Sequence, residues 1–489
     1  MFKIKESKFK KNKNIKFIKL SYLFYVLFIF IFAVSFLFFS SSCSRIQSAF
    51  ENNIVNNSNT QEQTIANSTQ TTEISNLAQN DNTIEIWDSC QPKERVFLAE
   101  TINNFLKQNL NYKINTRHFR NEEELVDVFT ASSLAGDGPE IILASFDSMR
   151  DLAKNDVIKD LTNEVNFNIF LPGLDEISNI NNKNYIIPFS SSDFLVFYYN
   201  KSLVKKIPSN FDDIISISKE LLSSKDQKYG LLLNAQEPEW DLPFLGGYLD
   251  WFYEYSTGDV TLNSNAMEKT LDFINNIYNV EKIIPKNMGY EDMNNLFKSG
   301  KAAMFINGVW AIDEYKSAGI DFGILKIPKV SDAITSPTPM ISGLGFMINN
   351  NISNKSFEIA KKFINYMISP DVQTGWTLNT QSFPALLGLE TDKLSSDNNI
   401  YNILLQAKIC RGKPYEEDLR IIRDVLRFNI GNLISGNINA SSAKEKMQED
   451  YIKLKSGKIQ IEDYSSTTET TNQRNTGSST SKTINTQAQ

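Results

Sequence analysis

Residues 299–310, Ser-Gly-Lys-Ala-Ala-Met-Phe-Ile-Asn-Gly-Val-Trp, hold the local signals that decide the fold. Apolar side chains at helical spacing precede them at 293–297, and Gly300 lies where a helix C-cap favours a left-handed residue. Residues 302–306 are an apolar run of strand length, which the Asn-Gly pair at 307–308 closes as a predicted tight turn. The stretch therefore predicts a helix, its cap, a buried strand and a turn.

Trp310 comes just after the carboxyl end of this predicted strand. Open α/β sheets bind ligands at that edge, and a flat apolar indole there can stack on the face of a sugar ring. Tryptophan is also highly buried on average. The local sequence leaves two roles open for Trp310, a ligand platform and a core side chain.

The N-terminus predicts export and a membrane tether. Residues 1–19 carry eight lysines and one glutamate, and residues 20–39 are apolar and uncharged, which is typical of an export signal. Ser-Ser-Ser-Cys at 40–43 resembles the lipobox of bacterial lipoproteins, in which Cys43 is lipidated after removal of residues 1–42. Ser40 stands where the lipobox usually has a Leu-like residue. An uncleaved transmembrane anchor is the alternative, because about twenty apolar residues span a bilayer.

The net charge of the chain narrows the classes of binding partner. The chain has 50 basic and 57 acidic residues, and without residues 1–42 it has 42 and 56, a formal net charge of −14. A body with this negative charge is poorly suited to bind nucleic acid or an anionic membrane, because like charges repel.

Cys90 and Cys410 fit one disulfide or two buried thiols, and the sequence does not decide between these.

Composition separates a folded body from two polar segments. Residues 43–81 and 465–489 are rich in Asn, Ser, Thr and Gln, so we expect a disordered tether and a disordered tail. The roughly 380 residues between them are too many for one hydrophobic core and suit two domains.

Strand-like and helical patterns alternate through the body, which indicates an α/β fold with mostly parallel sheets covered by helices. Three serines at 190–192, between two apolar strands, mark a predicted crossing point between domains. The predicted strands are 84–87, 112–116, 140–144, 194–199 and 229–233, and the predicted helices are 95–106, 122–134 and 211–222.

Several motifs in chain order resemble bacterial extracellular solute-binding proteins of the maltodextrin-binding type. The opening stretch is similar to the family's GKAAMxxNGPW segment, with Val309 in place of Pro. Gly-Asp-Gly-Pro-Glu-Ile at 136–141 resembles the GDGPDI turn and strand. The other matches are Phe-Tyr-Tyr-Asn-Lys at 197–201, Asn-Ala-Gln-Glu-Pro at 234–238, Ala-Gly-Ile-Asp-Phe-Gly at 318–323, Ser-Gly-Leu-Gly-Phe at 342–346 and Ser-Pro-Asp-Val-Gln at 369–373.

The resemblance, which spans residues 83–454, implies a two-lobed periplasmic-binding-protein-like fold of class II. Each lobe would be a mostly parallel sheet flanked by helices, and several chain crossings would form the hinge. Residues 82–189 and 341–382 would form the N-terminal lobe, and residues 193–335 and 385–456 the C-terminal lobe. Members of the family close over a solute, because contacts from both lobes exist only in the closed state.

The resemblance also implies the partners. Family members deliver their solute to the membrane permease subunits of an ABC importer. We therefore expect an exported, lipid-anchored monomer on the outer face of the cytoplasmic membrane or at the cell surface, without cofactor, metal or nucleic acid.

Candidate ligand-binding residues follow from the matched positions. Asp147 matches a carboxylate that accepts sugar hydroxyls, with a helix N-cap as the alternative. Glu237 and Trp240 match a loop that supplies an acid and an aromatic platform, and Trp310 becomes a stacking platform. Tyr415 is the aromatic residue nearest to the C-terminal helix around 419–430, where the family's stacking tryptophan is absent.

Some positions depart from the maltodextrin binders. Ala144 stands where they carry an aromatic residue, and Ser-Cys-Gln-Pro at 89–92 replaces their charged pair. These changes argue against maltodextrin itself and favour another sugar, a short oligosaccharide or a polyol. We expect Trp87 and Trp376 in the core.

Two other functions compete with this reading. An exported glycoside hydrolase would use paired carboxylates such as Asp147 and Glu237 as acid and base, and a surface adhesin or sensor would keep the binding fold. The single histidine, His118, argues against a Ser-His-Asp triad or a multi-histidine metal site, and we expect it at a solvated strand end. Because the similarity covers the whole body and belongs to a family of binders, we expect no enzyme.

Overall fold

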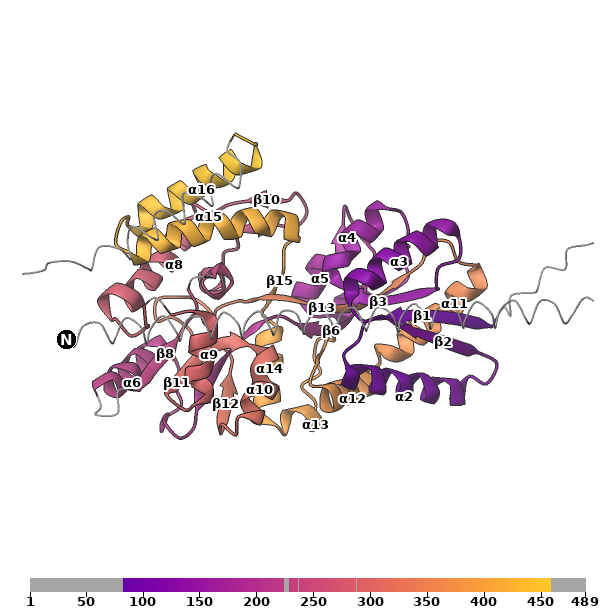
Figure 1. Ribbon diagram of the computed structural model, residues 1–489, viewed down its shortest axis with the longest axis horizontal. Helices are drawn as coiled ribbons and strands as arrows, with labels where there is room; N and C mark the ends of the chain where they lie inside the picture. The colour runs from indigo at the N-terminus through magenta and orange to yellow at the C-terminus, as the bar shows by residue number, and fades with distance from the viewer. Residues whose placement is uncertain (1–81, 224–227, 236, 287, 459–489) are drawn as a thin grey trace, which may run out of the picture. The chain divides into compact units, whose positions relative to one another are not determined.

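The computed structural model describes residues 82–223, 228–235, 237–286 and 288–458, which belong to one compact unit. Two β-sheets with helices packed on them form this part of the chain (Figure 1). The lipidation predicted at Cys43 and the segments 43–81 and 465–489 lie outside the described residues. Among the helices of the described ranges, none has the length and apolar character needed to cross a membrane.

The first sheet has the strand order β14-β6-β13-β3-β1-β2, with β15 paired to β13. Its strands are β1 (Thr83–Asp88), β2 (Lys113–His118), β3 (Ile141–Ser145), β6 (Ile187–Ser192), β13 (Met340–Ile348), β14 (Phe383–Pro384) and β15 (Arg411–Gly412). β1 is parallel to β2 and β3, whereas β13 is antiparallel to β3 and β6.

The second sheet has the order β12-β7-β11-β8, with β11 parallel to β8 and antiparallel to β7. Its strands are β7 (Leu195–Asn200), β8 (Tyr229–Leu232), β11 (Ala302–Gly308) and β12 (Phe322–Leu325). Two short hairpins pair β4 (Asn179–Ile180) with β5 (Lys183–Asn184) and β9 (Tyr253–Glu254) with β10 (Asp259–Val260).

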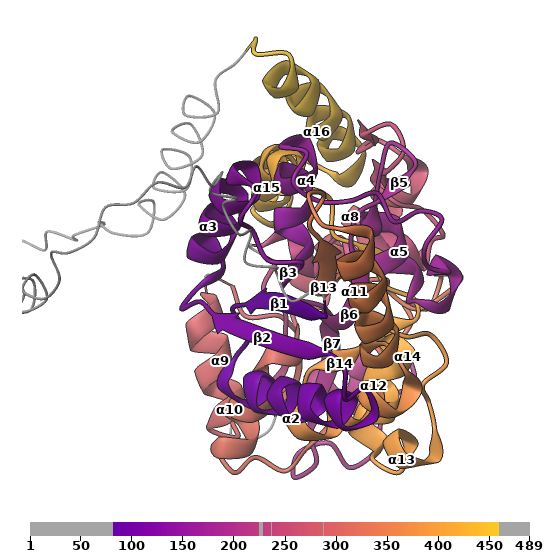
Figure 2. The ribbon, with the colours of Figure 1, turned by 90° about the vertical axis from the view of Figure 1, so that its right-hand side faces the viewer.

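Helices cover both faces of the first sheet; Figure 2 shows β1 and β2 between α3 and α2. The side chain of Asn121 accepts a hydrogen bond from the Glu124 N–H at 2.9 Å and so caps α3 at its start, and Gly136 ends that helix at φ 85°. The helices of this part are α2 (Pro92–Gln108), α3 (Glu122–Ala135), α4 (Phe146–Lys154), α5 (Pro172–Ser178), α11 (Asn354–Met367) and α12 (Pro370–Thr380), with the 3₁₀ turn η2 (Phe167–Ile169).

The helices around the second sheet include the long α15, which packs against its neighbour α16. They are α6 (Phe211–Ser223), α7 (Pro243–Gly247), α8 (Asn265–Asn275), α9 (Tyr290–Lys298), α10 (Ile312–Ser317), α13 (Asp392–Ser395), α14 (Asn398–Ala407), α15 (Glu416–Ile434) and α16 (Ala440–Lys455). The turns η3 (Pro238–Trp240) and η5 (Val309–Ala311) are 3₁₀, and η4 (Asn276–Val280) is π-helical.

The chain crosses between the two sheets several times. It leaves the first sheet at Ser192, passes through Asp193 at φ 56° and enters the second sheet at Leu195. It returns between Leu325 and Met340, and after β14 it runs to α14, which packs on β12. The crossing predicted at 190–192 thus falls at the end of β6.

The pairing within the sheets is more mixed than the mostly parallel arrangement that we expected. β6 leads toward the second sheet and β13 arrives from it, so these neighbours run in opposite directions. The same holds in the second sheet for β7, which arrives from the first, and β12, which leads back. Antiparallel pairs therefore accompany the segments that cross between the sheets.

The opening stretch folds largely as predicted. Gly300 follows α9 at φ 69°, which confirms the left-handed cap, and β11 is buried along its length. The turn predicted at 307–308 is wrong, because Asn307 and Gly308 pair with β7 inside the sheet. The chain turns one residue later, in η5.

Buried side chains confirm the core positions predicted for Trp87 and Trp376. Cys90 and Cys410, for which the sequence left both a disulfide and two thiols open, are free buried thiols. Burial raises the pKa of both thiols above the usual range.

Candidate functional site

Trp310 lies on η5, directly beyond the carboxyl end of β11. Its side chain is 48% exposed, so it does not fill the core. The indole Nε1 donates a hydrogen bond to the Tyr290 hydroxyl at 3.1 Å, and this bond restrains the orientation of the half-exposed ring.

Trp240 and Tyr290 complete an aromatic cluster with Trp310. The Trp240 and Trp310 ring centroids are 6.3 Å apart at 83°, and Trp240 lies 5.9 Å from Tyr290. Trp240 is anchored by a hydrogen bond from its Nε1 to the Ile306 carbonyl at 2.8 Å. Trp240 is thus bonded to β11 and Trp310 lies just beyond its last residue, so two indoles from two different turns meet at this strand end, and edge-to-face rings of this kind stabilise each other.

Gly308 makes room for Trp310. A Cβ built on Gly308 would lie 2.1 Å from three atoms of the Trp310 ring, which no real side chain tolerates. The backbone φ of Gly308 is −75°, a value that any residue adopts, so space rather than backbone freedom requires glycine here.

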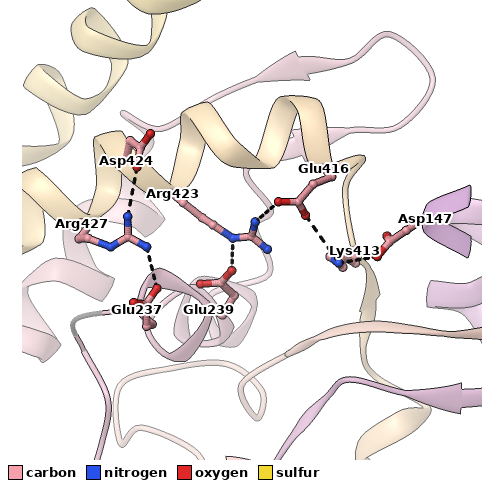
Figure 3. A network of polar contacts seen from close by, with 8 residues as sticks. All are labelled: Asp147, Glu237, Glu239, Lys413, Glu416, Arg423, Asp424 and Arg427. Atoms are coloured by element: carbon pink, nitrogen blue, oxygen red, sulfur yellow. Dashed lines mark hydrogen bonds and ion pairs between the residues drawn. The ribbon is translucent and has the colours of Figure 1, made fainter. Parts of the chain in front are cut away.

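Glu237 and Asp147, the predicted sugar-hydroxyl acceptors, are both ion-paired (Figure 3). Arg427 Nη2 lies 2.8 Å from Glu237 Oε2, and Lys413 Nζ lies 2.8 Å from Asp147 Oδ2. Together with the pairs Arg423–Glu239, Arg423–Glu416, Lys413–Glu416 and Arg427–Asp424 they form what we call the ion-pair network.

The ion-pair network joins elements of both sheets. Asp147 belongs to α4 beside the first sheet, whereas Arg423 and Arg427 project from α15 toward η3 (Figure 3). Because η3 also carries Trp240, the acids Glu237 and Glu239 lie next to the aromatic cluster along the chain. Indole faces, carboxylates and guanidinium groups thus come together, which is the chemistry that polyhydroxylated ligands use.

Asp193 adds a further carboxylate near Asp147. Desolvation of its carboxyl group by the surrounding protein raises its pKa above the ordinary value, although the residue is exposed overall; the nearby Lys413 opposes this rise and Asp147 adds to it. Asp193 sits at the crossing from β6 to β7, so this acid lies on a loop that joins the two sheets rather than on a helix.

The N-cap alternative for Asp147 does not hold, because Ser145 occupies the N-cap position of α4. Asp147 instead lies in the first turn of the helix, where a negative charge is favourable.

Tyr415 stands apart from the aromatic cluster. Its hydroxyl donates to the Asn179 carbonyl at 3.0 Å, and the Arg150 guanidinium lies 4.4 Å from its ring centroid. Tyr415 lines a cavity of 530 Å³ together with Tyr253, Tyr255 and the β4–β5 hairpin, and no residue of the aromatic cluster lines this cavity. Burial raises its pKa to about 12. A ligand contact for Tyr415 stays a prediction that its neighbours do not favour.

His118 ends β2 with its Nδ1 2.9 Å from Asp88 Oδ1, so it is exposed but paired. Within the described residues, no group of three or more His, Cys, Asp or Glu side chains is arranged to hold a metal ion.

Comparison with known proteins assigns the chain to a family. A family model described as bacterial extracellular solute-binding protein matches residues 100–401. The chain belongs to that family. A maltotriose-binding protein of Pyrococcus abyssi is 22% identical over 65% of this chain and 70% of its own length. A maltooligosaccharide ABC transporter solute-binding lipoprotein of Streptococcus pneumoniae is 22% identical over 65% of this chain and 77% of its own.

Solved structures agree with the fold of this extracellular solute-binding protein. The maltose/maltodextrin-binding domain MalE from Bdellovibrio bacteriovorus, bound to maltotriose, has a TM-score of 0.55 and 27% sequence identity, over 76% of this chain and 99% of that domain. The two-lobed α/β fold that we expected is thereby confirmed.

Sequence reasoning missed several side chains of this candidate site. They are Asp193, Glu239, Tyr290, Lys413, Arg423 and Arg427. A signal existed for two of them: Arg423 and Arg427 are four residues apart on the helix from which the family's stacking tryptophan is missing.

Proposed function

We propose that this chain is the substrate-binding lipoprotein of an ABC importer that captures a sugar, short oligosaccharide or polyol and delivers it to membrane permease subunits. Residues 82–189 with 341–382 and residues 193–335 with 385–456 form the two lobes that close on the solute. The chain acts as a monomer without catalysis, and Cys43 carries the lipid. The names of the relatives, which bind maltotriose and maltooligosaccharides, support the solute class.

The observation that carries the proposal is the exposed indole of Trp310, held by Tyr290 and Trp240 at the end of β11. A solvent-facing tryptophan anchored by a hydrogen bond loses little side-chain entropy when a ligand stacks on it. Sugar rings offer an apolar face for such stacking and hydroxyl groups along their edges. The hydroxyls meet Glu237 and its neighbours on η3.

The charged side chains serve as hydrogen-bond partners rather than as acid and base. Carboxylates accept from hydroxyl groups and guanidinium groups donate to them, and such charge-assisted bonds are about twice as strong as neutral ones. Asp147 comes from the first sheet and Glu237 from the second, so a solute that binds both favours the closed state.

Replacing Trp310 tests the proposal. We expect Trp310→Ala to weaken binding of the best sugar by about tenfold or more, and Trp310→Phe to weaken it less because a ring remains. The melting temperature without ligand should change little, because the indole is half exposed. Calorimetric titration and thermal shift with maltotriose, a galacto-oligosaccharide and a polyol measure both quantities.

Tyr401→Ala is the matched control, since Tyr401 is an exposed ring on α14 outside the aromatic cluster. It should leave affinity unchanged. If peptides or phosphate esters stabilise the protein while no sugar or polyol does, the carbohydrate assignment is wrong. Turnover of a bound glycoside would instead support the hydrolase.

A further inference from the structure

Lys413 is held at the hinge by the backbone. It follows β15, and its N–H donates to the Ile341 carbonyl of β13 at 2.9 Å. Its side chain is only 19% exposed, although most lysines extend into water. Most of the side chain is therefore covered, beside Asp147 of α4 and Glu416 at the start of α15.

Two carboxylates lie within ion-pair distance of this ammonium group. Asp147 Oδ2 on α4 lies 2.8 Å away and Glu416 Oε2 on α15 lies 3.7 Å away. A third acid, Asp193 on the crossing from β6 to β7, feels the charges of both Lys413 and Asp147. Asp147 and Asp193 repel each other, and the cation offsets this repulsion.

We propose that Lys413 is a specificity-determining residue, whose ammonium group occupies the place that a cationic group of a ligand would take and so reserves the site for neutral solutes. The inference rests on the proposed function, because it takes Lys413 and its two carboxylate partners as part of the solute site.

Charge explains why a neutral sugar is admitted and an amino sugar is not. Each ionised carboxylate offers about four lone-pair sites, so Asp147 can keep Lys413 and still accept a hydroxyl hydrogen. A protonated amine would meet the like charge of Lys413 at close range, where the partial burial of the lysine side chain reduces screening by water. Without Lys413, the same acids would lack their cation and would attract the amine.

Two matched ligands test the proposal in the full chain, kept in mild detergent. The glucosamine trimer at pH 6 carries protonated amines, and its fully N-acetylated form is the neutral counterpart. Calorimetric titration at low salt gives the affinity ratio of the two. We expect the wild type to favour the neutral trimer, and Lys413→Met to shift the ratio toward the cationic trimer by about tenfold or more.

Two variants serve as controls. Lys413→Arg keeps the charge and should keep the wild-type ratio. Lys201→Met removes a lysine that pairs with Asp321 on the exposed surface, 2.8 Å away, and should also leave the ratio unchanged. Should Lys413→Met fail to fold, Lys413→Gln repeats the test with a polar head group.

The outcomes separate the two claims. An unchanged ratio in a folded Lys413→Met variant overturns the role of Lys413, while sugar binding by the wild type leaves the proposed function standing. Preference of the wild type for the cationic trimer overturns the role as well. If the wild type binds no sugar at all, the proposed function fails. In that case, a gain of cationic-trimer binding in Lys413→Met still supports the role of Lys413 in excluding cations. No gain overturns that role.

Discussion

Gly308 shows how much of the site depends on a side chain that is absent. The indole of Trp310 lies against the strand end only because nothing projects from Gly308. The hydrogen bond to Tyr290 then fixes the ring, and Trp240 supports its edge. The position of the indole is thus decided by two neighbours and one glycine.

Gly308→Ala should therefore displace the indole of Trp310. The added Cβ would collide with the ring, while the backbone at φ −75° accepts alanine without strain. We expect sugar affinity to fall by roughly tenfold, close to the loss for Trp310→Ala. The melting temperature without ligand should change little, because the ring can swing into solvent. Calorimetric titration and tryptophan fluorescence measure the two effects.

Gly431→Ala is the matched control, since a Cβ on this helical glycine of α15 meets no atom within 4 Å. It should keep full affinity and gain slightly in stability, as alanine favours helices. Full affinity in Gly308→Ala would show that the observed ring position is not the one that binds solute.

Single residues were predictable where the reason was local. The place of Trp310 just beyond a strand and the burial of that strand follow from a pattern a few residues long, whereas the same pattern left open whether the indole is exposed. The partners of Asp147 and Glu237 do not, because Lys413 is 266 positions from Asp147 and Arg427 is 190 positions from Glu237. Only the folded chain shows that these acids are charge-paired.

Two buried glutamines hydrogen-bond backbone groups outside the ladders of the sheets, as a capping side chain does at the end of a helix. β12 is an edge strand of the second sheet, and beyond it the Ile327 N–H donates to Gln406 Oε1 on α14 at 2.8 Å. Gln406 Nε2 donates in turn to the Pro337 carbonyl at 3.2 Å. Gln373 on α12 bridges the Phe189 carbonyl and the Ala385 N–H in the same way. Side chains from helices thus satisfy backbone groups that no strand reaches.

Gln406→Leu should leave the Ile327 N–H and the Pro337 carbonyl buried without partners. An unsatisfied buried polar group costs about 1–3 kcal/mol, so we expect the free energy of unfolding to fall by at least that amount. Urea unfolding followed by circular dichroism measures it. Asn402→Ala on the exposed face of the same helix, whose side chain bonds only the local Asn398 carbonyl, is the control. Equal stability of the two variants would remove the role assigned to Gln406.

Elements were predicted well where a pattern repeats and poorly where pairing decides. The helices 122–134 and 211–222 were each placed within one residue of α3 and α6. The Asn-Gly pair at 307–308 signals a turn locally, yet both residues continue β11 because β7 offers them partners. A two-residue turn signal gives way to a ladder of hydrogen bonds with a strand more than a hundred positions earlier.

At the scale of the molecule, the two sheets do not have separate cores. One cluster of buried side chains runs from β1 and α3 through α12 and α14 to one face of the second sheet, where Tyr198 and Phe322 belong to it. The other face, including Phe197, packs with Phe211 of α6 and with side chains of α8, α15 and α16 as a second cluster. The boundary between clusters lies at a sheet, not at the crossings between the sheets. Local sequence patterns could not predict this, because it depends on where α14 packs.

The chain should therefore unfold in one cooperative transition, although proteins of several domains often do not. Phe129→Ala in the first cluster and Phe211→Ala in the second each remove a fully buried ring, at a cost of about 3–5 kcal/mol. Because β7 and its neighbours contribute side chains to both clusters, each variant should lower the same single melting temperature in differential scanning calorimetry. Leu134→Ala on the exposed face of α3 should leave it unchanged. Two separate transitions, of which Phe129→Ala moves only one, would mean that the shared core does not couple the sheets, and that solute closure joins two independently stable halves.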